Sequence, residues 1–252
     1  MIPGVCNVAE IKECCNFKIN GFFRNTCCLE SQQNILTKQL DKPKSIYVLI
    51  PIFGTVIFLL LYIIATLLYP GGSQVDKNSI GFSWVDNYWC NLLNKNAING
   101  QFNPAKPVAL TGMFILCLTL TLFWFIFPKQ INVGKSLKLI IQISGALAMI
   151  VAFFLFTSIN HDIITNLASS FGAIATVGTF IGLYKNNWRR LFFFGLFNIL
   201  LVVLNNYVYY NKDLIIYLPV VQKITFATFL LWICCIDVNL YRYQAVKDKN
   251  NL

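Results

Sequence analysis

Residues Tyr47–Tyr69 read YVLIPIFGTVIFLLLYIIATLLY, a run without a charged side chain that stops at the turn signal Pro70-Gly71-Gly72. About 20 residues of α-helix are needed to cross roughly 30 Å of membrane hydrocarbon. The run is therefore long enough and apolar enough to be a membrane-spanning helix. We expect Pro51 and Gly54 to bend its first half.

Five further apolar runs follow, separated by segments that hold most of the charges. The chain of 252 residues is 57% hydrophobic and only 12% charged, about half the charge of an ordinary soluble domain. The sequence predicts an all-α, polytopic membrane protein, a six-helix transmembrane bundle without a second soluble domain. The further spans are predicted at Val108–Pro128, Leu139–Ser158, Ile164–Tyr184, Leu191–Tyr210 and within Leu214–Tyr241.

The distribution of basic residues predicts the orientation of these spans. If both termini are cytoplasmic, 15 of the 20 Lys and Arg residues fall in inner segments and five in outer ones, which fits the positive-inside rule. We expect a multi-pass protein of the cell membrane (an inner membrane in bacteria) with cytoplasmic N- and C-termini. It would have a polar, partly disordered tail at 1–45, a six-span domain at 46–243 and a second tail at 244–252.

The net charge of +10 would suggest a nucleic-acid partner in a soluble protein. Here the basic residues lie in short segments beside the apolar runs, so their membrane orientation is the better explanation. We expect no nucleic-acid partner.

The only long connection, residues 70–107, is predicted to be an outer loop with one short helix. It contains Ser83-Trp84-Val85-Asp86-Asn87-Tyr88-Trp89-Cys90, and Ser83 with Asp86 three residues later is typical of a helix N-terminus. Apolar residues recur there at helical spacing, at Trp84, Val85, Tyr88, Trp89, Leu92 and Leu93. The helix would lie flat at the outer headgroup boundary, either as a lid over a pocket between the spans or only as an anchor for the loop.

Charges within the last span are further candidates for a binding site. Lys223 and Asp237 are 14 residues apart, about 21 Å along a helix and nearly four turns, so they project from similar faces. Charges at membrane depth often mark function. Lys223 could meet Asp162 or Asp213, and Asp237 could meet Arg189 or Arg190. Alternatively, Lys223 extends toward the headgroups and Asp237 lies among the inner ones.

His161-Asp162 is the only pair of neighbouring histidine and carboxylate residues. The candidate ligand-binding residues are thus Trp84, Asp86, Asn87, Tyr88, Trp89, His161, Asp162, Lys223 and Asp237.

No motif in the sequence predicts a catalytic or cofactor site. Nucleotide-binding glycine loops, G-x-S-x-G and H-E-x-x-H are absent. The pairs Cys14-Cys15 and Cys27-Cys28 lack the C-x2-C spacing and the nearby histidine of common metal sites. We expect no cofactor, no bound metal and no catalytic residue.

Small residues in the fourth span, among them Gly178 and Gly182, match the pattern that lets membrane helices approach closely. We predict that this helix is the packing centre of the bundle. Its small residues could also mediate dimerisation, but packing within the chain is the preferred interpretation.

From Tyr47 onward the chain resembles a family of uncharacterised six-span bacterial membrane proteins. The resemblance lies in Tyr69-Pro70-Gly71-Gly72, in Ser83 to Leu93, and in Asn103-Pro104 running into Leu110-Thr111-Gly112-Met113. That family is distantly similar to the damage-regulated autophagy modulator and FGF-receptor-activating-protein families. The resemblance implies a six-helix membrane fold and little about activity.

These patterns leave three functions open. The first is a non-enzymatic integral membrane protein that binds a lipid or a partner protein through the outer loop and helix interfaces, with a homo-oligomer also considered. The second is a small-solute transporter or channel with a polar path past Lys223, Asn205, Asn198, Ser169 and Ser170. The third is a lipid-modifying enzyme, which should show clustered His, Asp or Ser residues at one membrane face, and no such cluster is seen.

Overall fold

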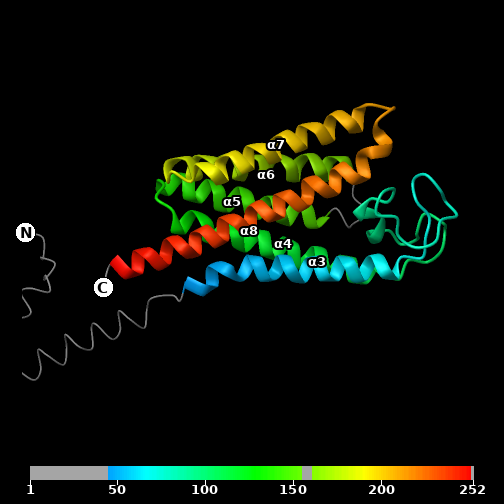
Figure 1. Cartoon of the computed structure of the whole chain (residues 1–252), viewed down its shortest axis with the longest axis horizontal. Helices are drawn as coiled ribbons and strands as arrows, with labels where there is room; N and C mark the ends of the chain where they lie inside the picture. The colour runs from blue at the N-terminus through cyan, green and yellow to red at the C-terminus, as the bar shows by residue number, and fades with distance from the viewer. Residues whose placement is uncertain (1–44, 155–160, 251–252) are drawn as a thin grey trace, which may run out of the picture. The chain divides into compact units, whose positions relative to one another are not determined.

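The structure is a computed structural model that describes residues 45–154 and 161–250. Within these ranges six long α-helices run alongside one another as a bundle (Figure 1). They are α3 (Ile50–Leu68), α4 (Ala105–Gln130), α5 (Lys135–Phe153), α6 (His161–Lys185), α7 (Arg189–Tyr210) and α8 (Leu218–Asn250). The predicted all-α six-helix bundle is confirmed. Residues 244–250 of the predicted C-terminal tail continue α8, and the predicted tail at 1–44 lies outside the described residues.

All six helices are long and apolar enough to cross a membrane. In hydrocarbon a helix satisfies its own backbone hydrogen bonds, and large apolar side chains such as Leu60, Leu67 and Leu200 remain exposed on the outside of the bundle. These features indicate a multi-pass membrane protein.

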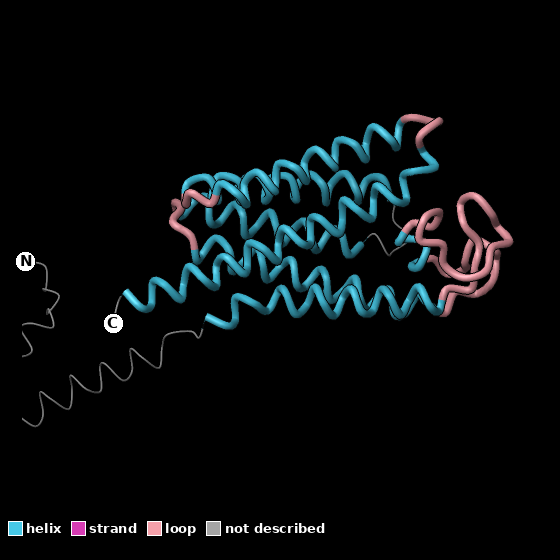
Figure 2. Tube along the Cα trace, in the orientation of Figure 1, coloured by secondary structure: helices cyan, strands magenta, loops and turns pink. Residues whose placement is uncertain are grey.

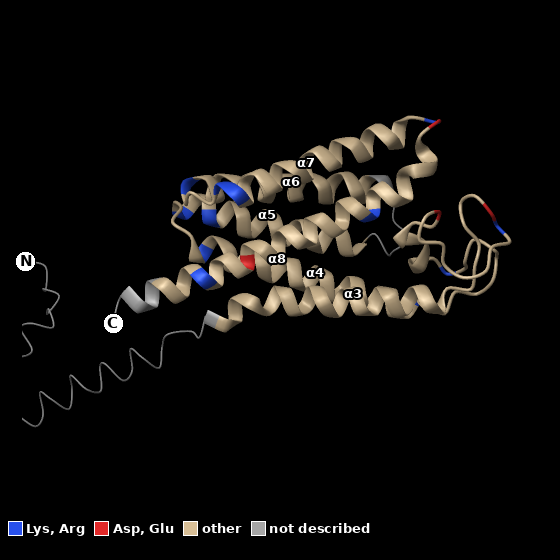
Figure 3. Cartoon of the chain, in the orientation of Figure 1, with Lys and Arg blue, Asp and Glu red and all other residues tan. Residues whose placement is uncertain are grey.

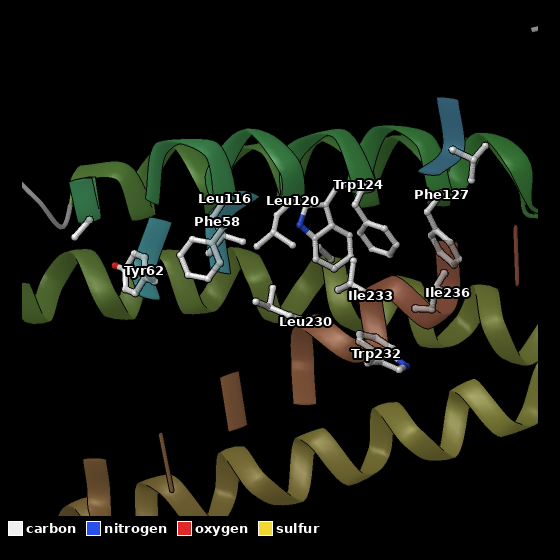
Figure 4. Packing of buried hydrophobic residues seen from close by; sticks show 14 of the residues in the cluster. Phe58, Tyr62, Leu116, Leu120, Trp124, Phe127, Leu230, Trp232, Ile233 and Ile236 are labelled. Atoms are coloured by element: carbon white, nitrogen blue, oxygen red, sulfur yellow. The ribbon is translucent and has the colours of Figure 1, made fainter. Parts of the chain in front are cut away.

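Large side chains of α4 occupy the centre of the bundle. α4 packs against α3, α5, α6 and α8, and Figure 4 shows Leu116, Leu120, Trp124 and Phe127 of α4 among side chains of α3 and α8. The predicted central position of α6 is therefore wrong, because α6 packs mainly against α5 and the bulky side chains of α4 fill the volume between the helices.

The small residues of α6 do pack within the chain, as preferred from the sequence. A Cβ atom on Gly178 would lie 2.5 Å from the Ile141 side chain of α5, and one on Gly182 would lie 2.5 Å from Ile131. Because these two positions are filled by neighbours in the same chain, their contacts are intramolecular.

Residues 69–104 fold into a compact unit at one end of the bundle, which we call the cap (Figure 2). It consists of turns, two isolated antiparallel bridges (Gly71 with Ile80, Asn96 with Phe102) and the short 3-10 helix η2 (Trp89–Leu93). We call this end of the bundle the cap end. Most of the described Lys and Arg residues lie at the opposite end, which we call the basic end (Figure 3).

The predicted short helix is present as η2, but the predicted apolar stripe from Trp84 to Leu93 is wrong. Residues 84–86 form a turn, so the stripe is not carried by one helix. Trp84 and Val85 are exposed, whereas Asn87 and Asn91 are buried. The physical reason is that short polar side chains hydrogen-bond to nearby backbone groups and so compete with helix formation.

Candidate functional site

Asn87, one of the predicted ligand-binding residues, is buried in the cap and stabilises it through side-chain hydrogen bonds, and we call such a residue a brace. Its side-chain nitrogen donates to the Gly72 carbonyl at 2.8 Å, and its side-chain oxygen accepts from the Ser83 N–H at 2.8 Å. The neighbouring pair predicted from the sequence also forms: the Ser83 hydroxyl donates to Asp86 at 2.7 Å and accepts from the Asp86 N–H at 3.1 Å. These contacts close a turn, and both polar groups of the Asn87 side chain are engaged.

Asn103 is a second brace, which was not among the candidate residues. Its side chain is fully buried, with its nitrogen near the carbonyls of Asn91, Leu92 and Asn94 at 3.0–3.4 Å. Its side-chain oxygen accepts from the Ala105 N–H at 3.1 Å, at the start of α4. The sequence pattern that could have identified Asn103 is an Asn directly before the Pro that precedes a helix, because Asn side chains commonly hydrogen-bond to backbone groups at such positions.

Lys223, in the first turns of α8, fixes the cap to the bundle. Its amine donates to the Asn87 carbonyl at 2.5 Å and to the Pro219 carbonyl at 3.1 Å, and it lies 5.8 Å from the centre of the Phe82 ring. Asp86 is close enough to interact with it electrostatically. The predicted pairing with Asp213 is wrong, because the cap reaches Lys223 instead. The side chains of His161 and Asp162 lie outside the described residues.

Trp89 joins the cap to two spans through ring contacts. Its ring centre lies 5.3 Å from that of Tyr62 on α3 and 5.4 Å from that of Phe226 on α8. Its indole N–H is buried and has no hydrogen-bond partner in the part of the chain that the structure describes. The cap therefore rests on α3 and α8 through an aromatic contact beside the Lys223 hydrogen bonds.

The side chains of Tyr88 and Cys90 in the cap both have a raised pKa. Burial raises the pKa of the Tyr88 phenol, with Cys90 and Tyr209 of α7 adding to the effect. The Cys90 thiol is at the exposed surface, yet desolvation by surrounding protein atoms raises its pKa, and nearby Lys223 offsets part of that rise.

Two hollows lie at opposite ends of α7. At the cap end, an open cavity of about 600 Å³ is lined by Val203, Asn206, Tyr207, Tyr210, Asn211 and Lys212. At the basic end, a cavity of about 350 Å³ is lined by Asn187, Trp188, Arg189, Arg190, Leu191 and Asn239. Each combines cationic, amide and aromatic side chains, which suits the binding of an anionic group and offers no paired nucleophile and base.

Asp237 of α8 lies on the same face as Lys223, as the spacing predicted, but it is completely buried. Neither of its carboxylate oxygens has a hydrogen-bond partner among the described residues. The predicted pairing with Arg189 or Arg190 is therefore wrong. Those arginines are exposed and line the cavity at the basic end.

The residues of the predicted polar path are mostly engaged in local contacts. The Asn205 side chain donates to the Leu201 carbonyl and to Thr225 of α8, and the Asn198 side chain donates to the Phe194 carbonyl. Neither cavity is lined by Lys223, Asn205 or Asn198. In the described ranges, no three His, Cys, Asp or Glu residues lie close enough together to hold a metal ion.

Comparison of the chain with known protein families, with curated proteins and with solved structures finds no match.

Proposed function

We propose that this chain is a non-enzymatic protein of the cell membrane that binds a phospholipid at the cap end of α7. The observation that carries the proposal is the open cavity of about 600 Å³ at the end of a candidate membrane span. Lys212 supplies an ammonium group for a lipid phosphate. Tyr207 and Tyr210 supply amphipathic rings of the kind that lie at the membrane–water interface.

The surface of α7 next to the cavity suits an acyl chain. Leu196, Leu200 and Val203 are exposed apolar residues at intervals of three and four, so they form a stripe that runs along α7 toward the cavity. A headgroup in the cavity would therefore place its acyl chain along this stripe.

The test is lipid retention by the full-length protein purified in mild detergent, measured by native mass spectrometry with added phosphatidylglycerol. Lys212→Glu should lower the bound fraction about tenfold, which corresponds to the loss of roughly 1.4 kcal/mol. Lys77→Glu is the matched control, because Lys77 is exposed on the cap and does not line the cavity. Equal retention by Lys212→Glu and wild type would remove the proposal.

We further propose an orientation in the membrane, with the cap outside the cell and both chain ends in the cytoplasm. The separation of basic residues toward the end opposite the cap supports this orientation (Figure 3). We also propose that the chain is a member of the six-span bacterial family that its sequence resembles. The six candidate spans support this assignment.

A second candidate is the binding of a protein partner, or of a second copy, on the cap. Five apolar side chains of the cap are half to almost fully exposed: Val75, Ile80, Trp84, Val85 and Phe102. A photo-crosslinker at Ile80 in intact membranes should give a protein adduct of defined mass if a protein binds there. Lipid adducts alone would reject this candidate.

Transport of a small solute past Lys223 has weaker support. The amine of Lys223 donates to two backbone carbonyls, one of them in the cap, which is the environment of an anchoring residue. A lipid-modifying activity has no supporting observation among the described residues.

A further inference from the structure

Asp237 is the buried ionisable residue that the contacts described above do not explain. Its side chain is 0% exposed, and both carboxylate oxygens lack a hydrogen-bond partner within the described residues. Nearby on α8, Ile233, Ile236 and Leu240 are also fully buried. The carboxyl group therefore lies in an apolar part of the bundle core.

The polar groups around Asp237 do not neutralise a negative charge. Cys234, one turn earlier on α8, is close enough to interact with Asp237 electrostatically, and the nearby Thr55 hydroxyl of α3 donates to the Pro51 carbonyl of its own helix. None of the described ionisable side chains at this end of the bundle forms an ion pair or a hydrogen bond with Asp237. These side chains include Tyr47 before α3, Lys129 of α4, Lys135 and Lys138 of α5, Tyr184 and Lys185 of α6, Arg189 and Arg190 of α7, and Cys234, Cys235, Tyr241, Arg242 and Tyr243 of α8.

A buried carboxylate without a partner is strongly disfavoured, because the protein interior does not replace its hydration. A carboxylic acid is neutral, so one bound proton removes most of this penalty. We propose that Asp237 is a proton-binding site, whose carboxyl group carries a proton while the bundle is closed and exchanges it with water at the basic end. Ionisable residues inside membrane helices commonly serve in such proton pathways. This inference does not depend on the lipid site proposed for α7.

The position of Asp237 makes the basic end its side of access. Arg242 is five residues further along α8, about 8 Å, whereas Lys223 is about 21 Å away in the other direction. At the basic end α8 packs against the short 3-10 helix η1 (Ser45–Leu49) and against the start of α7, and Val48 of η1 is completely buried. Along α8, water at the basic end is therefore nearer to Asp237 than water at the cap end.

The experiment is infrared spectroscopy of the full-length protein in nanodiscs at neutral pH. Wild type should show the C=O stretching band of a protonated carboxylic acid, and Asp237→Asn should lose it. Asp86→Asn is the matched control and should keep the band, because Asp86 lies in the cap and is hydrogen-bonded by Ser83. Alkaline titration should remove the wild-type band.

The proposal would be overturned if Asp237→Asn kept the C=O band, or if wild type did not show it. Replacing choline by sodium at constant pH should leave the band unchanged, and its disappearance would show a site for a metal cation instead of a proton.

If Asp237→Asn does not fold, wild type is treated with the apolar reagent dicyclohexylcarbodiimide, which modifies protonated carboxyl groups. Mass spectrometry should then find Asp237 modified at neutral pH but not at alkaline pH, and an unmodified Asp237 at neutral pH would reject the site.

Discussion

Lys223 and Asp237 lie on one face of α8, about four helical turns apart, but they have opposite surroundings. At the cap end, two backbone carbonyls and an aromatic ring surround the Lys223 amine. Toward the basic end, neither Asp237 oxygen has a described partner. The difference shows that a charged side chain in a membrane helix finds a hydrogen-bond partner only where a distant segment of the chain brings one close to it. Asn87, which accepts from Lys223, is 136 residues away in the chain.

The largest expected effect comes from removing the internal brace of the cap. Asn103→Ala leaves buried carbonyls without a donor, and each unsatisfied group costs about 1–3 kcal/mol. We expect the free energy of unfolding to fall by roughly 2–4 kcal/mol, measured by denaturation in detergent. Asn94→Ala is the control, because Asn94 is an exposed residue of the same cap. Equal stability of the two variants would show that the cap does not depend on this brace.

Lys223→Met should loosen the attachment of the cap to α8, because it removes the amine while it keeps an unbranched side chain. Hydrogen bonds to charged groups contribute about 1.5–3 kcal/mol, and half-exposure of Lys223 reduces this to roughly 1–2 kcal/mol. Amide hydrogen exchange should become faster over residues 82–90, whereas exposed Lys77→Met should leave it unchanged. Unchanged exchange in both variants would show that the aromatic contacts alone hold the cap.

Asp237→Leu should have a smaller effect of the opposite sign. No described interaction is lost, and replacing a buried polar group by an apolar one of similar volume is often neutral or stabilising. We expect the thermal midpoint in detergent to stay equal or rise by a few degrees. A clear fall in that midpoint, comparable to the fall in Lys223→Met, would mean that Asp237 has a stabilising partner and that the contrast between the two ends is incorrect.

The smallest effect concerns Cys90, whose labelling should leave stability unchanged and report the side of the cap. A membrane-impermeant maleimide should label it from outside intact cells, and Cys90→Ser should abolish that labelling. Because the pKa of the thiol is raised, less of the reactive thiolate is present at neutral pH. Labelling should therefore be slower than for a free thiol and accelerate as the pH rises. Labelling only after lysis would reverse the proposed orientation.

The spans were predictable because their signal is local. A run such as Tyr47–Tyr69 is apolar along its whole length, and its helix needs no other segment to satisfy its backbone. The cap was not predictable in the same way. Asn87 is not among the apolar positions of the predicted helix, but the structure buries it against Gly72, 15 residues away. The αL-region backbone of Gly72 (φ +82°) and its closeness to Asn99 leave no space for a side chain there, and no periodic pattern encodes that contact.

The sequence by itself determined six apolar crossings, one long connection and an excess of basic residues in the segments opposite it, because hydrophobicity and charge act on each segment separately. Only the tertiary structure decided that asparagine side chains stabilise this connection, that Lys223 is bound by the cap and that Asp237 has no hydrogen-bond partner among the described residues. Those outcomes depend on which groups from remote parts of the chain meet in a low-dielectric interior, where a polar atom is stable only with a partner or a proton.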